Sequence, residues 1–371
     1  MPKRPAEPHR SVRRNATGTN ANQQQITPHR DVLRVVAIGG GTGLSALLRG
    51  LKAFVPHHSA ELGATTSGPH VDITAVVTVS DDGGSSGRLR RELGTLPPGD
   101  IRNCMVALSE DEALLSQLFQ YRFESGRGLK GHSFGNLFLS AMTALTGDFA
   151  KAIAFSSEVL ASRGRIFPST SEHVTLSAEL VDGSMVSGET RISRSRVRIH
   201  RVAMEPERPK PLPETIDAIL GADLVCLGPG SLYTSVIPNV LVSGIPAALK
   251  LSPARVVYFP NLMWQPGETL GYSASDHVQA IHDHAGEEIV DWVVVNTTPI
   301  SGGMRRRYAT ERLFPVANDL PKLAAMGVEA IGRRLLDSGE KVRHSPAATA
   351  EAVMELAVRS RRERVVRPAS K

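Results

Sequence analysis

A glycine-rich segment near the start of the chain has the composition of a phosphate-binding turn. It consists of Gly39, Gly40, Gly41, Thr42 and Gly43. An apolar run at 32–38 precedes it and an amphipathic stretch at 44–54 follows, which predicts a buried strand, a turn and a helix. Glycine lets the backbone close on an anion, and a helix start offers unpaired N–H groups and a positive dipole end. We therefore expect phosphate at this turn.

A second turn of the same kind strengthens this interpretation. It contains Gly228, Gly230 and Ser231 and follows an apolar run at 224–227. Two such turns at one edge of a sheet would form one crevice. A lone match to the GxGxxG/A pattern, here Gly41 to Ala46, is also explained by a tight turn without a ligand. No acid stands at a strand end about 20 residues further on, which weakens NAD binding without excluding it.

At three further places the sequence allows both a structural and a ligand-binding role, and two of them are next to expected helix starts. Ser133 is by one interpretation simply a helix N-cap, which leaves His132 as a surface loop residue. By the equally weighted functional interpretation His132 and Asn136 reach a phosphate or the transferred group, and Ser133 and Asn136 are among the expected ligand contacts. The segment 97–103 is by default a rigid loop in which Asp100 caps a helix, although its side chains could also reach a ligand. Trp264 either stacks on a base or sugar or packs into the fold, and we favour packing.

Paired acids at the end of a predicted strand indicate a metal. Asp81 and Asp82 follow the apolar run 73–79, and two adjacent carboxylates at the crevice would repel each other without a counter-ion. Mg²⁺ prefers carboxylate oxygens and bridges phosphates, so a Mg²⁺ site is one hypothesis. A solvated Asp-Gly turn is the alternative. A zinc site at His277, His282 and His284 is not expected, because helical spacing does not bring all three to one face.

The elements that position these residues form an α/β pattern. Apolar runs at 32–38, 73–79, 224–227, 256–259 and 289–295 predict parallel strands, and helical spacing lies between them at 44–54, 101–123, 133–145 and 274–284. Alternating polar and apolar residues at 173–204 predict a small antiparallel insertion. We expect a Rossmann-like, mostly parallel sheet flanked by helices, with this insertion.

The charge distribution separates the ends of the chain from its body. The net charge is +6, yet residues 1–34 hold seven Lys or Arg against two acids, and residues 340–371 hold eight against four. The body is slightly acidic, which makes nucleic acid an improbable main partner. We expect a disordered basic tail at 1–30, one α/β domain at 31–335, and a basic C-terminal helix and tail at 336–371.

Cysteine usage and hydropathy indicate a cytoplasmic protein. Only Cys104 and Cys226 occur, far apart and without a metal-binding or disulfide spacing. No apolar stretch has the roughly 18 residues of a membrane helix, and the first 30 residues contain no apolar signal core. The motifs GxSxG, CxxC and HExxH do not occur, so no catalytic nucleophile or metalloprotease site is expected.

Six segments together resemble the YvcK family of gluconeogenesis factors. They cover 37–44, 79–90, 96–102, 131–136, 228–234 and 265–269. The resemblance spans about 32–335 in the same order, and the family is a branch of the CofD-like superfamily. The glycine and serine extension after Asp82 favours the YvcK branch over the superfamily's transferases. Leu270, where Asp is common in the family, and Trp264, where Thr is usual, are departures that put the ligand preference in question.

The resemblance implies a regulator that binds a UDP-sugar, with UDP-N-acetylglucosamine as the ligand. It implies a role in cell-wall synthesis and cell shape during gluconeogenic growth, and contacts from Tyr272 and Arg307 to the ligand. A protein partner in cell-wall precursor metabolism and a homo-oligomer are further expectations, with no tightly bound organic cofactor. The alternative is a Mg²⁺-dependent transferase that moves a phosphate-ester group from a nucleotide-diphosphate-linked donor, as 2-phospho-L-lactate transferases do.

Overall fold

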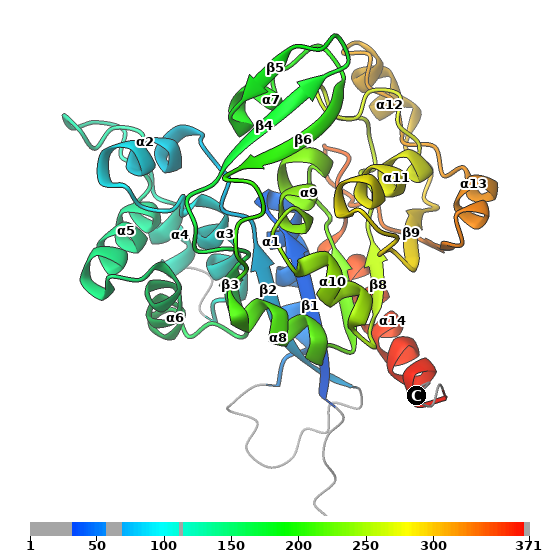
Figure 1. Cartoon of the computed structure of the whole chain (residues 1–371), viewed down its shortest axis with the longest axis horizontal. Coiled ribbons are helices and arrows are strands. Elements are labelled where there is room, and N and C mark those ends of the chain that lie inside the picture. The colour runs from blue at the N-terminus through cyan, green and yellow to red at the C-terminus, as the bar shows by residue number, and fades with distance from the viewer. Residues whose placement is uncertain (1–31, 57–68, 111–113, 367–371) are drawn as a thin grey trace, which may run out of the picture. The chain divides into compact units, whose positions relative to one another are not determined.

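The computed structural model describes residues 32–56, 69–110 and 114–366 (Figure 1). The predicted tail at 1–30 and the last residues of the predicted C-terminal tail lie outside the described residues. Within these segments no single helix is long and apolar enough to span a membrane, whereas one bent helix pair, Leu232–Val240 and Ile245–Leu251, satisfies the length and composition test.

A parallel sheet forms the centre of the protein. Its strands are β1 (Val32–Gly39), β2 (His70–Val77), β3 (Arg165–Pro168), β7 (Leu224–Leu227), β8 (Arg255–Tyr258), β9 (Trp292–Asn296) and β10 (Glu329–Arg333). They lie in the order β10-β9-β8-β7-β1-β2-β3, and every neighbouring pair is parallel. The central strands are mostly apolar and buried, and all four residues of β7 are, as expected for a sheet covered on both faces. The predicted Rossmann-like α/β fold is confirmed.

The strand order reverses between β1 and β7. From β1 the chain adds β2 and then β3 on one side, and from β7 it adds β8, β9 and β10 on the other. Right-handed crossovers place the helices of the two halves on opposite faces of the sheet. A crevice therefore opens between the loops that follow β1 and β7, which is where open α/β sheets bind ligands.

Helices pack on the sheet in two groups. One group contains α1 (Gly41–Leu51), α3 (Gly99–Leu108) and α14 (Pro346–Val366), in which α1 contacts both of the others. The other contains α8 (Pro213–Gly221), α9 (Ile237–Val240), α10 (Ile245–Leu251) and α11 (Ala274–Ala285). Ala350, Val353 and Ala357 of α14 are buried in the main core, so this C-terminal helix packs on the same sheet.

The remaining helices belong to neither of these two groups. They are α2 (Gly84–Leu93), α4 (Leu114–Gln120), α5 (Phe134–Thr146), α6 (Phe149–Val159), α7 (Glu189–Ile192), α12 (Gly302–Ala309) and α13 (Leu320–Ala325). One of them, α7, packs on the antiparallel insertion. Single turns of 3-10 and π-helix add Lys52–Phe54 and Leu232–Val236. The predicted helix at 101–123 is wrong in its continuity, because α3 ends at Leu108 and α4 begins only at Leu114.

The predicted antiparallel insertion is a three-stranded sheet. It contains β4 (Thr175–Leu180), β5 (Met185–Ser187) and β6 (Ile199–Glu205), in the order β5-β4-β6. Its apolar side chains alternate with exposed ones along β4 and β6, as expected for a sheet covered on one face. The insertion lies at the top of the view in Figure 1, next to α9. Its short helix α7 reaches the end of β2, as the contacts of Asp82 below show.

The loops after β1 and β7 approach each other so closely at Gly43 that this position requires glycine. A Cβ atom at Gly43 would lie 2.3 Å from the Pro229 carbonyl oxygen, which is backbone and cannot swing aside. We expect Gly43→Ala to lower the free energy of unfolding by about 1–3 kcal/mol, measured by urea titration. The matched control is Gly303→Ala in the exposed helix α12, where a Cβ meets nothing within 4 Å. Equal stabilities of the two variants would contradict this account.

Candidate functional site

The two glycine turns meet at the reversal point of the sheet. The Gly228 N–H donates to the Ile38 carbonyl at 2.9 Å, and the α-carbons of these loops are near enough that a Cβ at Gly39 would contact Gly228 at 3.8 Å. Gly41 and Gly228 have φ angles of +63° and +73°, in the left-handed region that favours glycine. The prediction that both turns form one crevice is confirmed.

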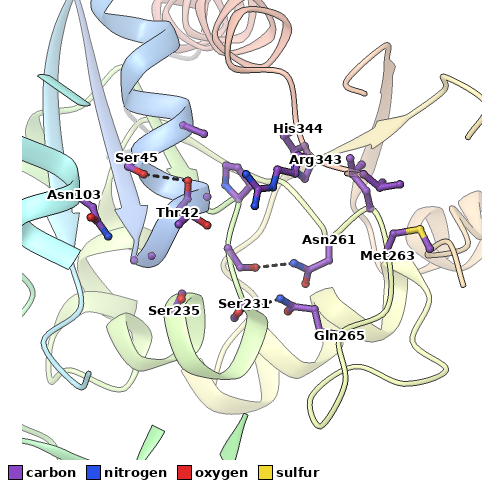
Figure 2. A pocket seen from close by; sticks show the side chains of 18 of the residues that line it. Thr42, Ser45, Asn103, Ser231, Ser235, Asn261, Met263, Gln265, Arg343 and His344 are labelled. Atoms are coloured by element: carbon purple, nitrogen blue, oxygen red, sulfur yellow. Dashed lines mark hydrogen bonds between the residues drawn. The ribbon is translucent and has the colours of Figure 1, made fainter. Parts of the chain in front are cut away.

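A cavity of about 800 Å³ opens over these turns. Figure 2 shows Thr42 and Asn103 on one side of it and Asn261 and Gln265 on the other. The lining residues from the two turns are Gly40, Gly41, Thr42, Gly43, Pro229, Gly230 and Ser231. Gly39 and Gly228 lie just behind them, where they allow the strand ends to approach each other. The volume is sufficient for a nucleotide-sized ligand.

The start of α1 points its backbone amides at the cavity. Gly40 precedes the helix in an extended conformation and has no side chain that could cap it. The Gly41 amide donates to the half-buried Asp100 carboxylate. The amides of Thr42 and Gly43, together with the positive end of the dipole of this eleven-residue helix, can bind an anion.

Arg102 is the cation that α3 places beside this helix start. The predicted loop at 97–103 with Asp100 as its helix cap is wrong, because α3 already begins at Gly99 after Pro98, and Asp100 instead accepts the Gly41 amide. Arg102 lines the cavity although its side chain is 8% exposed. Its Nη1 donates to Ser133 Oγ at 2.6 Å and to Asn136 Oδ1 at 3.0 Å, and its Nη2 donates to Asn103 Oδ1 at 2.8 Å. The Nε atom is buried and has no hydrogen-bond partner among the described residues. Three neighbours therefore fix the guanidinium through its two Nη atoms.

Ser133 and Asn136 therefore lie behind Arg102, outside the cavity lining. Ser133 is the N-cap of α5 and accepts a hydrogen bond from the Asn136 amide, which confirms the capping interpretation. Asn136 Nδ2 also donates to Ser86 Oγ at 3.4 Å. Any effect of these two residues on a ligand passes through the position of Arg102.

Two side-chain amides brace the second turn from the opposite wall. Asn261 Nδ2 donates to the Gly230 carbonyl at 2.9 Å, and Gln265 Nε2 donates to Ser231 Oγ at 3.0 Å. Trp264, between them, donates from Nε1 to the Tyr272 carbonyl at 3.0 Å. The indole also packs edge-to-face on Phe314 while it lines the cavity, which agrees with packing as its main role.

The cavity lining is strongly basic in the part of the chain that the structure describes. Its ionisable side chains include four arginines and one glutamate: Arg49, Arg102, Arg122, Arg343 and Glu189. Burial, followed by the nearby Asp81, raises the pKa of Glu189 to about 9, so this carboxyl group is neutral at pH 7. Burial likewise raises the pKa of Asp100 to about 6. The surplus of positive charge favours a polyanionic ligand.

Asp81 and Asp82 are hydrogen-bonded at the edge of the site. Asp81 Oδ1 accepts from the Gly83 amide at 2.8 Å, and Asp82 Oδ1 accepts from both the amide and the hydroxyl of Thr190 at 2.9 and 2.6 Å. Gly83, which follows Asp82, is the N-cap of α2, and the helix begins at Gly84. Neither acid lines the cavity, and within the described ranges no group of three His, Cys, Asp or Glu residues is arranged to hold a metal. A pair of carboxylates remains compatible with Mg²⁺, which completes its shell with water and phosphate.

Tyr272 and Arg307 lie away from the main cavity. The Tyr272 hydroxyl pairs with that of Tyr233 at 2.7 Å, and both tyrosines line a smaller cavity of about 360 Å³ beside the insertion. Arg307 is exposed on α12, where it donates to the Glu340 carbonyl, and its neighbour Tyr308 lines the main cavity. The structure thus does not bring these two residues together with the glycine turns.

Several residues that line the cavity were not predicted from the sequence. Asn261 follows a predicted strand at 256–259, and a search for polar residues at strand ends would have found it. Arg343 and His344 lie far along the chain in a segment without a motif, and only the tertiary fold brings them to the cavity (Figure 2). Arg49 lies two turns into α1, on the helix face that turns to the site.

Comparison with known proteins places this fold and site in a class. The family model described as 2-phospho-L-lactate transferase CofD matches residues 35–336. The gluconeogenesis factor of Halalkalibacterium halodurans is 51% identical over 322 residues, which are 86% of this chain and 95% of that protein. The gluconeogenesis factor of Bacillus subtilis is 48% identical over 324 residues, covering 87% and 98%.

A solved structure agrees with these sequence matches. The crystal structure of a upf0052 family member from Bacillus halodurans superposes with a TM-score of 0.81 at 50% identity, covering 87% of this chain and 99% of that one. The fold and the cavity at its reversal point define a CofD-type α/β protein. The chain belongs to the CofD family and, within it, to the gluconeogenesis factors.

The raised pKa of Glu189 predicts a pH-dependent stability. Between the ordinary pKa of 4.5 and the folded value of about 9, the folded state retains a proton that the unfolded state has lost. The free energy of unfolding must therefore fall as the pH rises through this window. We expect Glu189→Gln to be more stable than the parent by about 1 kcal/mol or more at pH 9 and equally stable at pH 4, measured by urea unfolding. Glu179→Gln on exposed β4 is the control, and a Glu189→Gln difference that does not change with pH would contradict the prediction.

Proposed function

We propose that this protein is a cytoplasmic regulator that binds a nucleotide sugar, with UDP-N-acetylglucosamine as the preferred ligand. The observation that supports this most directly is the meeting of two glycine turns with four arginines over one cavity. The backbone amides at the start of α1 that Asp100 does not occupy suit a diphosphate, and the 800 Å³ volume leaves room for a base and a sugar.

The biological role in this proposal is support of cell-wall synthesis and cell shape during growth on gluconeogenic carbon sources. The name shared by the relatives from Halalkalibacterium halodurans and Bacillus subtilis, gluconeogenesis factor, supports the link to carbon source. A regulator responds to its ligand only through different affinities in two conformations. The contacts of Asp82 with Thr190 join the cavity edge to the insertion, and they are a candidate for the part that changes. The downstream target would be a protein of cell-wall precursor metabolism, and the protein would act as a homo-oligomer.

A Mg²⁺-dependent transferase is the second candidate. The family model bears the name of 2-phospho-L-lactate transferase, and Asp81 and Asp82 lie at the end of β2 beside the cavity. These acids would hold Mg²⁺, which supplies charge neutralisation for a diphosphate, while Arg102 and the α1 amides would orient that diphosphate. Among the described residues that line the cavity, no hydroxyl group is hydrogen-bonded to a basic side chain that could activate it as a nucleophile, so an acceptor substrate would have to provide one.

Binding and turnover distinguish the two candidates. We expect saturable calorimetric binding of UDP-N-acetylglucosamine or UDP-glucose at micromolar concentration, without release of UDP over hours in the presence of Mg²⁺. Nucleotide release from UDP- or GDP-linked donors would favour the transferase. Absence of binding below millimolar concentration for both UDP-sugars would refute the proposed function.

The basic wall predicts the effect of removing one arginine. Arg343 is exposed to the cavity, and we expect Arg343→Ala to weaken UDP-sugar binding about tenfold through the loss of a charged contact to phosphate. The loss should shrink as salt rises, because screening reduces the contribution of an exposed charge. Arg306→Ala, on exposed α12 and outside the cavity lining, is the matched control. Equal affinities of the two variants would exclude a phosphate contact from Arg343.

A further inference from the structure

The wall opposite α1 presents hydrogen-bond acceptors without partners. Asn261 and Gln265 use their amide nitrogens on Gly230 and Ser231, so their oxygens are left for other contacts. Both oxygens, Asn261 Oδ1 and Gln265 Oε1, are buried and have no donor within the described part of the chain. The orientation of Asn261 is fixed, because the Gly230 carbonyl can only accept and must therefore face the amide nitrogen.

His344 adds a third acceptor to this wall. Its ring hydrogen-bonds the backbone of Pro260, the residue before Asn261, and its Nε2 is buried without a partner among the described residues. Burial lowers the pKa of His344 to about 4, so the imidazole is neutral at pH 7. A neutral ring that donates from one nitrogen offers a lone pair on the other. Figure 2 shows His344 and Asn261 beside the same space.

Three buried acceptors that lack donors select among the parts of a nucleotide sugar. The pairing edge of uracil has a single N–H donor, so at most one acceptor of this wall would be satisfied and two would stay unpaired, which is costly in a buried site. The ribose of a nucleotide has only two hydroxyl groups. A hexose has at least three O–H donors, and each can donate to one acceptor of the wall.

The position of the wall agrees with this selection. The amides that present the acceptors also hold Gly230 and Ser231, which form one side of the expected diphosphate site. In a nucleotide sugar the hexose is bonded directly to the diphosphate, so its ring must lie next to whatever holds those phosphates. Given the proposed nucleotide-sugar function, on which this inference rests, we propose that Asn261, Gln265 and His344 form the hexose subsite and recognise its hydroxyl groups.

The test compares UDP with UDP-glucose and UDP-N-acetylglucosamine by calorimetry in the full chain. His344→Phe keeps a ring of similar size and removes the acceptor, and Gln265→Met keeps a chain of similar length. We expect His344→Phe to weaken the UDP-sugars about tenfold while leaving UDP within about twofold, because UDP lacks the hexose. Gln265→Met also removes the donor to Ser231, so we expect it to weaken UDP as well and the UDP-sugars about tenfold more than UDP. Retained UDP binding also demonstrates that the variant is folded. Met263→Leu, an apolar substitution in the same lining, is the control and should change neither affinity.

Deoxy analogues of the hexose locate the contact. We expect one deoxy analogue of UDP-glucose to bind the parent about tenfold more weakly than UDP-glucose and to bind His344→Phe as well as UDP-glucose does. An equal loss of UDP and UDP-sugar affinity in the variants would assign the wall to the nucleoside and overturn the subsite. Unchanged affinities in both variants would overturn it as well. If the parent chain binds neither UDP nor its sugars, the proposed function itself has failed.

Discussion

The close contact between two backbones is the constraint on which the rest of the site depends. At the reversal point of the sheet, Gly43 lies so near Pro229 that no side chain fits between α1 and the turn after β7. This contact lets the start of α1 and residues 229–231 line one cavity, with backbone groups on both sides. A backbone surface is rigid and carries fixed dipoles, so it can bind an anion with little reorganisation.

The two walls of the cavity differ in whether they offer hydrogen-bond donors or acceptors. On the α1 side, helix amides and Arg102 present donors, and Ser133 and Asn136 hold that guanidinium in place from behind. On the far side, Asn261 and Gln265 turn their donors toward the second turn, and their amide oxygens have no donor among the described residues. A ligand that satisfies both walls has an anionic part and a part rich in O–H groups, and a nucleotide sugar contains both within one bond of each other.

Two half-buried carboxyl groups near the arginines hold protons more readily than usual. Desolvation raises the pKa of both Asp100 and Glu189, so Glu189 is neutral at pH 7 and does not offset the charge of the arginines. Asp82 is hydrogen-bonded to Thr190 of the insertion. The small antiparallel sheet is thus joined to the end of β2 through a carboxylate, and through Glu189 it forms part of the cavity wall. The insertion is therefore part of the candidate site and not a separate appendage of the fold.

The sequence by itself determined the fold class and the two glycine turns that line the cavity. Uninterrupted apolar runs indicate strands covered on both faces, and glycines directly after two of them, at 39–43 and 228–231, are a local signal that needs no tertiary information. The antiparallel insertion was equally visible from the alternation at 173–204. The tertiary structure decided which polar residues face the cavity. Ser133 and Asn136 support Arg102, Tyr272 lines another cavity, and Arg343 and His344 arrive from a distant segment, because side-chain direction and chain crossings are set by packing and not by local pattern.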